Sequence, residues 1–113
     1  MTIDEYQSKA MRTVAGMNYE KYSTPEECLL INGVMGLNGE AGECIDSVKK
    51  YLFQGHALDK EHIAEELGDV AWYLAITAHA IGYDLSEILN NNIVKLLDRY
   101  PDGFSSDKSI NRN

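Results

Sequence analysis

The sequence predicts an all-α fold: a small, four-helix bundle-like domain with a central antiparallel helical hairpin. Apolar residues recur at alternating steps of four and three along most of the chain, which is typical of amphipathic helices. Helix-start signals precede these segments, and no stretch has the composition of a β-strand. With 113 residues, 44% of them hydrophobic, the chain is expected to form one domain with its own core.

Two segments in the first half of the chain are predicted to be helical. The first starts within residues 2–4 and carries an apolar face out to about Met17. The second begins after Thr24, where a proline at the first helical position and Glu27 at the third make a capping box. This second helix is expected to run to residues 51–53.

Four glycines recur at every third residue of the second helix: Gly33, Gly36, Gly39 and Gly42. Each costs about 0.5–1 kcal/mol relative to alanine in a helix interior. Their spacing places them on one slowly drifting stripe, along which another helix backbone or a phosphate can approach closely. The alternative is that the helix kinks or breaks between Gly33 and Gly39.

Two further helices are predicted in the second half of the chain. A turn-like stretch at 54–59 separates the second helix from the third. Asp59 is the expected N-cap of the third helix, and Gly82 is its expected stop. The fourth helix is expected to start after Asp84 and to end at Pro101.

Two pairs of carboxylates occupy matching positions in the second and third helices. Glu40 and Glu43 form one pair, Glu66 and Asp69 form the other, and each pair spans one helical turn. Each acid sits one position before an apolar residue of the predicted seam between the two helices. This seam is predicted to consist of Leu30, Val34, Leu37, Ala41, Cys44, Val48 and Leu52 on one helix and Ile63, Leu67, Val70, Leu74 and Ile81 on the other, with Thr77 filling a gap.

The antiparallel arrangement predicts that the four carboxylates meet. In a hairpin centred on the turn, Glu40 lies level with Asp69, and Glu43 lies level with Glu66. Such a cluster is strongly unfavourable unless protons or cations neutralise it. Hard divalent cations with oxygen ligands, Mg2+ or Mn2+, are the natural partners for this set. The alternative is that all four residues are ordinary solvated acids on an amphipathic face.

The order of these motifs resembles the MazG-type nucleoside triphosphate pyrophosphohydrolases, an all-α superfamily. The resemblance covers about residues 6–104 and is carried by Glu40-x-x-Glu43, Glu66-x-x-Asp69, Trp72-Tyr73-Leu74 and Asn92-x-x-Lys95-Leu-x-x-Arg99-Tyr-Pro-Asp-Gly-Phe104. It implies Mg2+-dependent hydrolysis of a nucleoside triphosphate to the monophosphate and pyrophosphate. All four acids would bind metal, with Glu40 or Glu43 as the catalytic general base.

Further residues are candidates for substrate binding: Tyr73, Asn92, Lys95, Arg99 and Lys50. Asn92, Lys95 and Arg99 lie on one stripe of the fourth helix. Mostly because of the resemblance, they are expected to hold the triphosphate. Compensation of the helix dipole by surface cations is the alternative. The family likeness places Tyr73 toward the pocket. Lys49 and Lys50 could reach phosphate or remain solvated. The histidines are interpreted as structural or surface residues: His56, His62 and His79.

The charge and cysteine content restrict the partners and the compartment. Eighteen acidic residues against ten basic ones give a formal net charge of −8, which argues against binding nucleic acid or an anionic membrane. Cys28 and Cys44 lie about 24 Å apart in one predicted helix, too far for a disulfide. With no signal peptide and no long apolar run, a cytoplasmic location with reduced thiols is expected.

Residues 1–104 are expected to form the folded domain, and residues 105–113 a polar, mobile tail. Apolar positions left uncovered on the first and fourth helices predict a homodimer or homotetramer. Two alternatives stay open. One is a narrower enzyme acting on pyrimidine deoxynucleotides or phosphoribosyl-ATP. The other is a non-catalytic helical dimerisation or regulatory module, which would have no reason to be stabilised selectively by Mg2+ or Mn2+.

Overall fold

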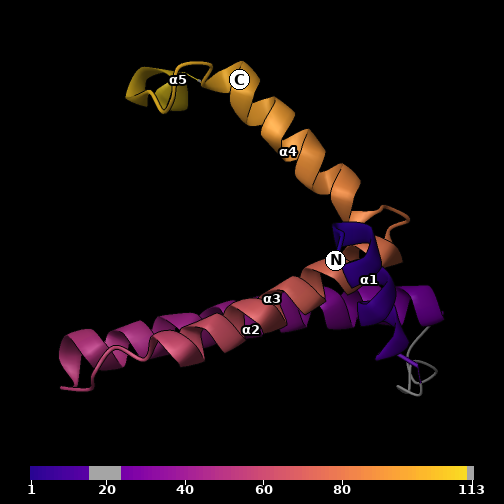
Figure 1. Cartoon of the computed structure of the whole chain (residues 1–113), viewed down its shortest axis with the longest axis horizontal. Helices are drawn as coiled ribbons and strands as arrows, with labels where there is room; N and C mark the ends of the chain where they lie inside the picture. Colours follow the sequence, from indigo (N-terminus) through magenta and orange to yellow (C-terminus); the bar gives the residue numbers. More distant parts are fainter. Residues whose placement is uncertain (16–23, 112–113) are drawn as a thin grey trace.

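The computed structural model describes residues 1–15 and 24–111, and within these ranges the chain is helical and has no strand. The helices are α1 (Ile3–Arg12), α2 (Pro25–Phe53), α3 (Lys60–Ala80), α4 (Leu85–Arg99) and the short α5 (Ser106–Ile110). The all-α prediction is therefore confirmed, including the central hairpin, in which α2 and α3 lie side by side and antiparallel (Figure 1). The fifth helix lies within the segment expected to be a tail.

The hairpin is built from the signals expected in the sequence. Thr24 caps α2 by accepting a hydrogen bond from the backbone N–H of Glu27 at 3.2 Å. The helix then continues through its glycines to Phe53, so the alternative of a break among them is wrong. Gly55 makes the turn with a φ of 74°, a conformation that glycine adopts without strain. Asp59 starts α3 by accepting from the N–H of His62 at 3.0 Å.

The first helix is shorter than expected. It was predicted to reach about Met17, which lies outside the described residues, but α1 ends at Arg12. The next residue, Thr13, turns its hydroxyl back to the carbonyl of Ala10 at 2.7 Å and accepts a hydrogen bond from the indole N–H of Trp72, also at 2.7 Å. Because a threonine hydroxyl can replace the helical hydrogen-bond pattern with local bonds, the chain leaves the helix here.

A small core forms where α1, α3 and the start of α4 meet. It consists of Ala10, Ala75, Ala78 and Leu85, with Tyr6, Trp72 and Ile88 packed against it. Buried Gln7 of α1 joins the three helices, because its amide nitrogen donates to the carbonyls of Ala75 and Tyr83 and its oxygen accepts from the N–H of Leu85 at 3.0 Å. Asp84 occupies the expected N-cap position of α4 but makes no side-chain capping bond. The glutamine therefore supplies an acceptor that α4 needs at its start.

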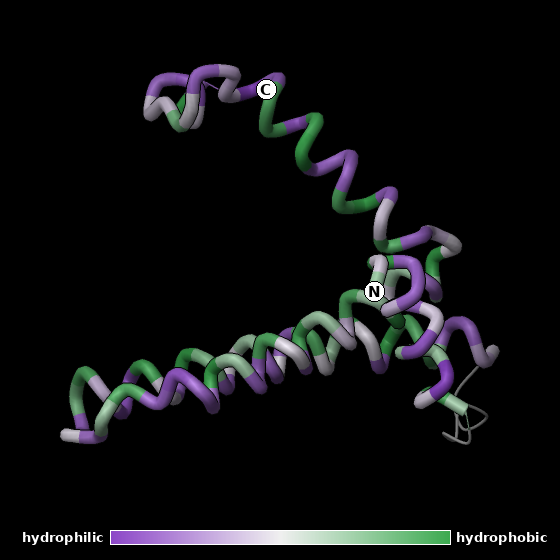
Figure 2. Tube along the Cα trace, in the orientation of Figure 1, coloured by the Kyte–Doolittle hydropathy of each residue, from purple (hydrophilic) through white to green (hydrophobic). Residues whose placement is uncertain are grey.

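Beyond its first turn, α4 leaves the hairpin. Figure 1 shows α4 and α5 pointing away from α2 and α3, so that the chain has the outline of a V. The radius of gyration is 17.4 Å, whereas a compact domain of this length has about 13 Å. Several apolar side chains of α4 are consequently exposed: Leu89, Ile93, Val94, Leu96 and Leu97. Figure 2 shows these hydrophobic stretches alternating with polar ones along α4.

The seam between α2 and α3 differs from the prediction. The α2 backbone meets α3 at its glycines, since a Cβ built on Gly33 would collide with Thr77 and one on Gly36 would collide with the Tyr73 ring. Because the helices approach each other along these glycines, the faces in contact differ from the predicted ones. The predicted apolar seam is therefore only partly buried. Seven of its residues are exposed, one of them Ile81 just after α3. The other six define what we call the outer apolar face: Val34, Ala41, Val48 and Leu52 of α2, and Leu67 and Leu74 of α3.

Candidate metal centre

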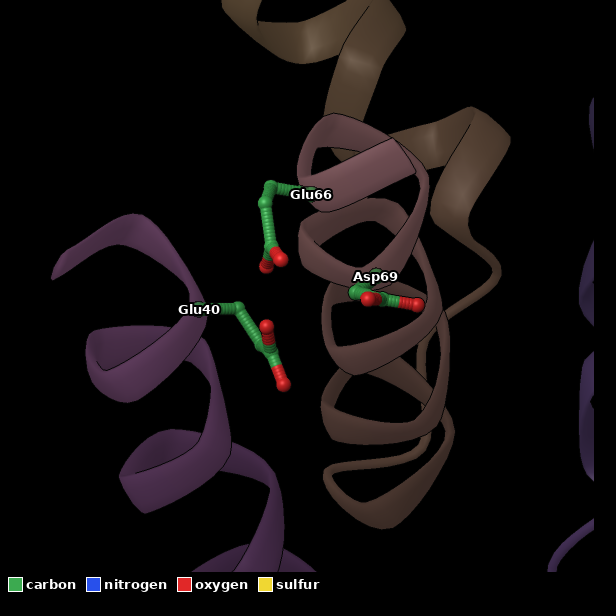
Figure 3. A group of neighbouring side chains, drawn as sticks. All are labelled: Glu40, Glu66 and Asp69. Carbon is green, nitrogen blue, oxygen red and sulfur yellow. The ribbon is translucent and has the colours of Figure 1, made fainter. Parts of the chain in front are cut away.

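Three carboxylates from the two hairpin helices converge between them. Glu40 projects from α2, and Glu66 and Asp69 project from adjacent turns of α3 (Figure 3). One oxygen from each residue lies within 4.8 Å of the other two. This arrangement follows from the register of the hairpin, which also places Gly36 against Tyr73 at the level predicted. Within the described residues this is the group of acidic, histidine or cysteine side chains with the geometry of a cation site.

The environment of these acids disfavours three full negative charges. Glu66 is buried, with 9% of its surface exposed, and its Oε2 makes no hydrogen bond within the described part of the chain. A hydrogen bond to Glu66, partial desolvation, and the charges of Glu66 and Asp69 raise the pKa of Glu40 above its ordinary value. Burial, together with the charge of Asp69, raises the pKa of the Tyr6 hydroxyl. The group therefore holds negative charge that a proton or a cation can stabilise.

The donor set fits a hard divalent cation. Mg2+ binds carboxylate oxygens at about 2.0–2.1 Å and fills its remaining positions with water or substrate phosphate. Three oxygens within 4.8 Å of one another can approach a common ion after small side-chain rotations. The buried oxygen of Glu66 is the strongest indication, because a polar atom rarely stays buried without a partner.

Glu43 lies outside this group of three. It lines a neighbouring polar pocket of about 230 Å³, near the hairpin turn, whose other lining residues are Asp46, Ser47, Lys50, His56, Ala57, Asp59 and His62. In this pocket the Lys50 ammonium lies 2.9 Å from one carboxylate oxygen of Asp46. Lys49, which does not line the pocket, lies 3.7 Å from the other oxygen. The contact with Asp46 and the nearby charge of Glu43 raise the pKa of Lys50. A cation and a fourth carboxylate thus stand beside the three converging acids.

The candidate substrate residues are divided between the hairpin and α4. Tyr73 packs on α2 at Gly36, and its ring makes an edge contact with Trp72 at a centroid distance of 4.9 Å. Asn92 and Lys95 are exposed on α4, whereas Arg99 is half-buried over the ring of Tyr100. Because α4 leads away from the hairpin, the single chain does not bring these three residues to the carboxylates (Figure 1).

His62, interpreted from the sequence as a structural or surface residue, contacts the carboxylate group. The Nε2 atom of His62 lies 3.4 Å from Oε1 of Glu66, one helical turn further along α3. The spacing of four residues was visible in the sequence. It gave no reason to expect that Glu66 would be buried, however, and burial is what makes the contact significant.

Fold and site together define an all-α protein with a carboxylate centre suited to a divalent cation. Residues 32–104 match the MazG nucleotide pyrophosphohydrolase domain. The chain belongs to this family, and the match includes both carboxylate pairs and the polar residues of α4. Over 120 aligned residues the chain is 33% identical to the Gene 37 protein of Mycobacterium phage L5, an alignment that covers 99% of this chain and 100% of the phage protein.

No solved structure matches the chain. In residues 1–15 and 24–111, no helix is both long and apolar enough to cross a membrane. Both cysteines are free thiols, Cys28 buried and Cys44 half-buried, as their predicted separation indicated.

Proposed function

We propose that this protein hydrolyses a nucleoside triphosphate, ribo or deoxyribo, to the nucleoside monophosphate and pyrophosphate. The observation that carries the proposal is the group of Glu40, Glu66 and Asp69, in which one carboxylate oxygen of each residue lies within 4.8 Å of the other two. Membership of a family of nucleotide pyrophosphohydrolase domains supports the reaction class. In the reaction, a water oxygen bonds to one phosphorus of the α–β anhydride, and the anhydride bond breaks to release the two products.

Mg2+, with Mn2+ as a possible substitute, is the proposed cofactor. Glu40, Glu66 and Asp69 would hold it, and Glu43 could join them through a rotation of its exposed side chain. When bound, the ion would neutralise phosphate charge and lower the pKa of a coordinated water. The net charge of −8 favours the participation of such an ion, because an unscreened acidic protein repels a triphosphate.

Glu43 is the better candidate for the general base. Glu40 stands within the group of three, where it is expected to bind the metal. Glu43 lies one turn further along α2, outside the group and exposed, so its carboxylate is free to accept the proton that the attacking water loses. The proton then passes to solvent.

Cations near the centre would bind the phosphates. Lys50 lines the pocket that also contains Glu43 and can exchange its contact with Asp46 for a phosphate oxygen. Lys95 and Arg99 are assigned the same task, with Asn92 as a hydrogen-bonding neighbour. In this proposal they reach the site from α4 of a second copy, because the chain's own α4 leads away from the carboxylates.

A homodimer or homotetramer is therefore part of the proposal. The outer apolar face of the hairpin and the apolar side of α4 together expose more hydrophobic surface than a monomer tolerates. In an antiparallel hairpin, residues that are rotated in the same direction from the line of contact on each helix lie on the same side of the hairpin. Val48 of α2 and Leu67 of α3 therefore belong to one continuous face. A second hairpin packed on this face would bury it in a four-helix core.

Pyrophosphate release tests the reaction. The panel contains ribo- and deoxyribonucleoside triphosphates and phosphoribosyl-ATP, assayed with Mg2+, with a chelator and with the Glu43→Gln variant. Release that depends on both metal and Glu43 is expected, and the ranking of substrates separates a broad enzyme from a narrower one. A folded, metal-loaded protein that releases nothing from any of them would favour a non-catalytic helical module.

A further inference from the structure

We propose that His62 is a positioning residue for Glu66, holding one carboxylate oxygen so that the other faces the metal. The inference deepens the proposed function and rests on its metal centre. The two oxygens of the Glu66 carboxylate have different surroundings.

The two oxygens of Glu66 are distinguished by their contacts. Oε1 lies 3.4 Å from Nε2 of His62, an ion-pair distance. Oε2 is buried and makes no hydrogen bond within the described residues. The side chain of Glu66 is only 12% exposed, so bulk solvent has little access to it. Oε1 therefore has a partner on α3, whereas Oε2 has none within the described residues.

The nitrogen of His62 that faces Glu66 is a donor when it carries a hydrogen, as in the imidazolium and in the neutral form protonated at Nε2. Carboxylates that bind metals are commonly oriented by outer donors, and removing such a donor typically weakens metal binding about 10- to 100-fold. His62 stands on the same helix as Glu66, so the contact is set by α3 alone.

The surroundings of His62 show why it does not join the metal ligands itself. It is not a member of the converging group, which contains Glu40, Glu66 and Asp69. Its ring instead lines the polar pocket together with Glu43, Asp46 and Lys50. The side chain is 43% exposed, and Asp59 accepts a hydrogen bond from its backbone N–H, so replacing the imidazole leaves the start of α3 intact.

Mn2+ binding without substrate tests the proposal. The dissociation constant is measured by titration of the free Mn2+ signal in electron paramagnetic resonance. We expect His62→Leu to weaken binding about 10- to 100-fold, whereas His62→Gln, which keeps an N–H donor, stays close to wild type. His79→Leu is the matched control, because His79 is an exposed histidine late in the same helix.

A spectroscopic measurement on the unmodified protein supplies an independent result. Electron spin echo modulation of bound Mn2+ should show no directly coordinated nitrogen. A strong nitrogen coupling that disappears in His62→Leu would make His62 a ligand and overturn the positioning role. Equal Mn2+ affinity in wild type, His62→Leu and His62→Gln would also overturn it. A wild-type protein that binds no Mn2+ would instead remove the metal centre, and the proposed function with it.

Discussion

The ring of Tyr73 lies against the backbone of Gly36, where any Cβ would collide with it. Three ring atoms of the tyrosine lie at the place that the first side-chain carbon would occupy. The contact joins α3 to α2 one turn from Glu40, so it helps to set the separation between the helices that carry the carboxylates. Glycine at this position thus allows the close approach on which the centre depends.

Replacing Gly36 by alanine should destabilise the protein by about 1–3 kcal/mol, because overpacking outweighs the better helix propensity of alanine. Gly39→Ala is the matched control, since a Cβ at Gly39 meets no atom within 4 Å. That change should stabilise the protein by about 0.5–1 kcal/mol. Urea unfolding followed by circular dichroism measures both. Equal stability of the two variants would show that Tyr73 does not rest on Gly36.

Glu66→Gln should abolish stabilisation by metal while preserving the fold. For the wild type, Mn2+ at about 100 times its dissociation constant should raise the free energy of unfolding by about 2.7 kcal/mol. The variant loses a ligand and a charge, so its melting temperature should no longer respond to Mn2+. Glu65→Gln removes the neighbouring exposed carboxylate, outside the group of three, and should respond as wild type does. A retained response in Glu66→Gln would place the ion elsewhere.

The stabilisation that Glu40 contributes to the metal-free protein should be lost as the pH rises from the acidic range toward neutrality. The pKa of Glu40 is raised in the folded state, mainly by its hydrogen bond to Glu66. The folded protein therefore binds this proton more tightly than the unfolded chain does. The resulting contribution is complete below the ordinary pKa of about 4.5 and is lost as the pH passes the raised value.

Glu40→Gln isolates this contribution. The free energy of unfolding of both proteins is measured in chelator at several pH values. The value for wild type minus the value for the variant should decrease as the pH increases. Added Mg2+ should reverse the trend, since ionised carboxylates bind the cation. A pH-independent difference would mean that Glu40 does not share its proton with Glu66.

The protein should have at least twice the 12.7 kDa mass of one chain in solution. Val48→Asp places a charge on the outer apolar face and should shift the mass measured by light scattering toward that of a single chain. Met35→Asp is the control, because Met35 is an exposed apolar residue of α2 outside this face. A wild-type protein that is monomeric at micromolar concentration would contradict the oligomer.

Two inactive variants should restore one another if α4 acts in a neighbouring subunit. Glu66→Gln damages the hairpin, and Arg99→Ala damages α4. When the two are co-expressed with different tags and the mixed dimer is isolated, one of its two sites combines an intact hairpin with an intact α4. About half of the wild-type activity is therefore expected from this dimer. No activity in the mixed dimer would mean that each site uses its own α4.

Much of the fold could be predicted because it depends on local signals. Thr24 and Asp59 cap the helices where expected, and Gly55 lies within the predicted turn. The register of the hairpin follows from the length of that turn. The faces of the helices that meet could not be predicted from apolar spacing, because the glycines admit a closer approach than leucines and valines do.

The direction of α4 also left no signature in the sequence. It is fixed by Gln7, whose amide bonds three backbone groups about seventy residues away along the chain. A single buried polar residue has no periodicity, so a pattern analysis does not detect it. The burial of Glu66, and with it the significance of His62, depends on the same long-range packing.

The chain buries few of its apolar side chains by itself. Within the described residues, only a few apolar side chains are buried, and several of these are small: Ala10, Cys28, Leu29, Ala75, Ile76, Ala78 and Leu85. If subunits supply the remaining burial, the midpoint of thermal unfolding rises with protein concentration, because dilution favours the unfolded monomer by mass action. The amount of protein made would then determine the fraction that is folded, and a poorly expressed copy would be exposed to proteolysis before it found a partner.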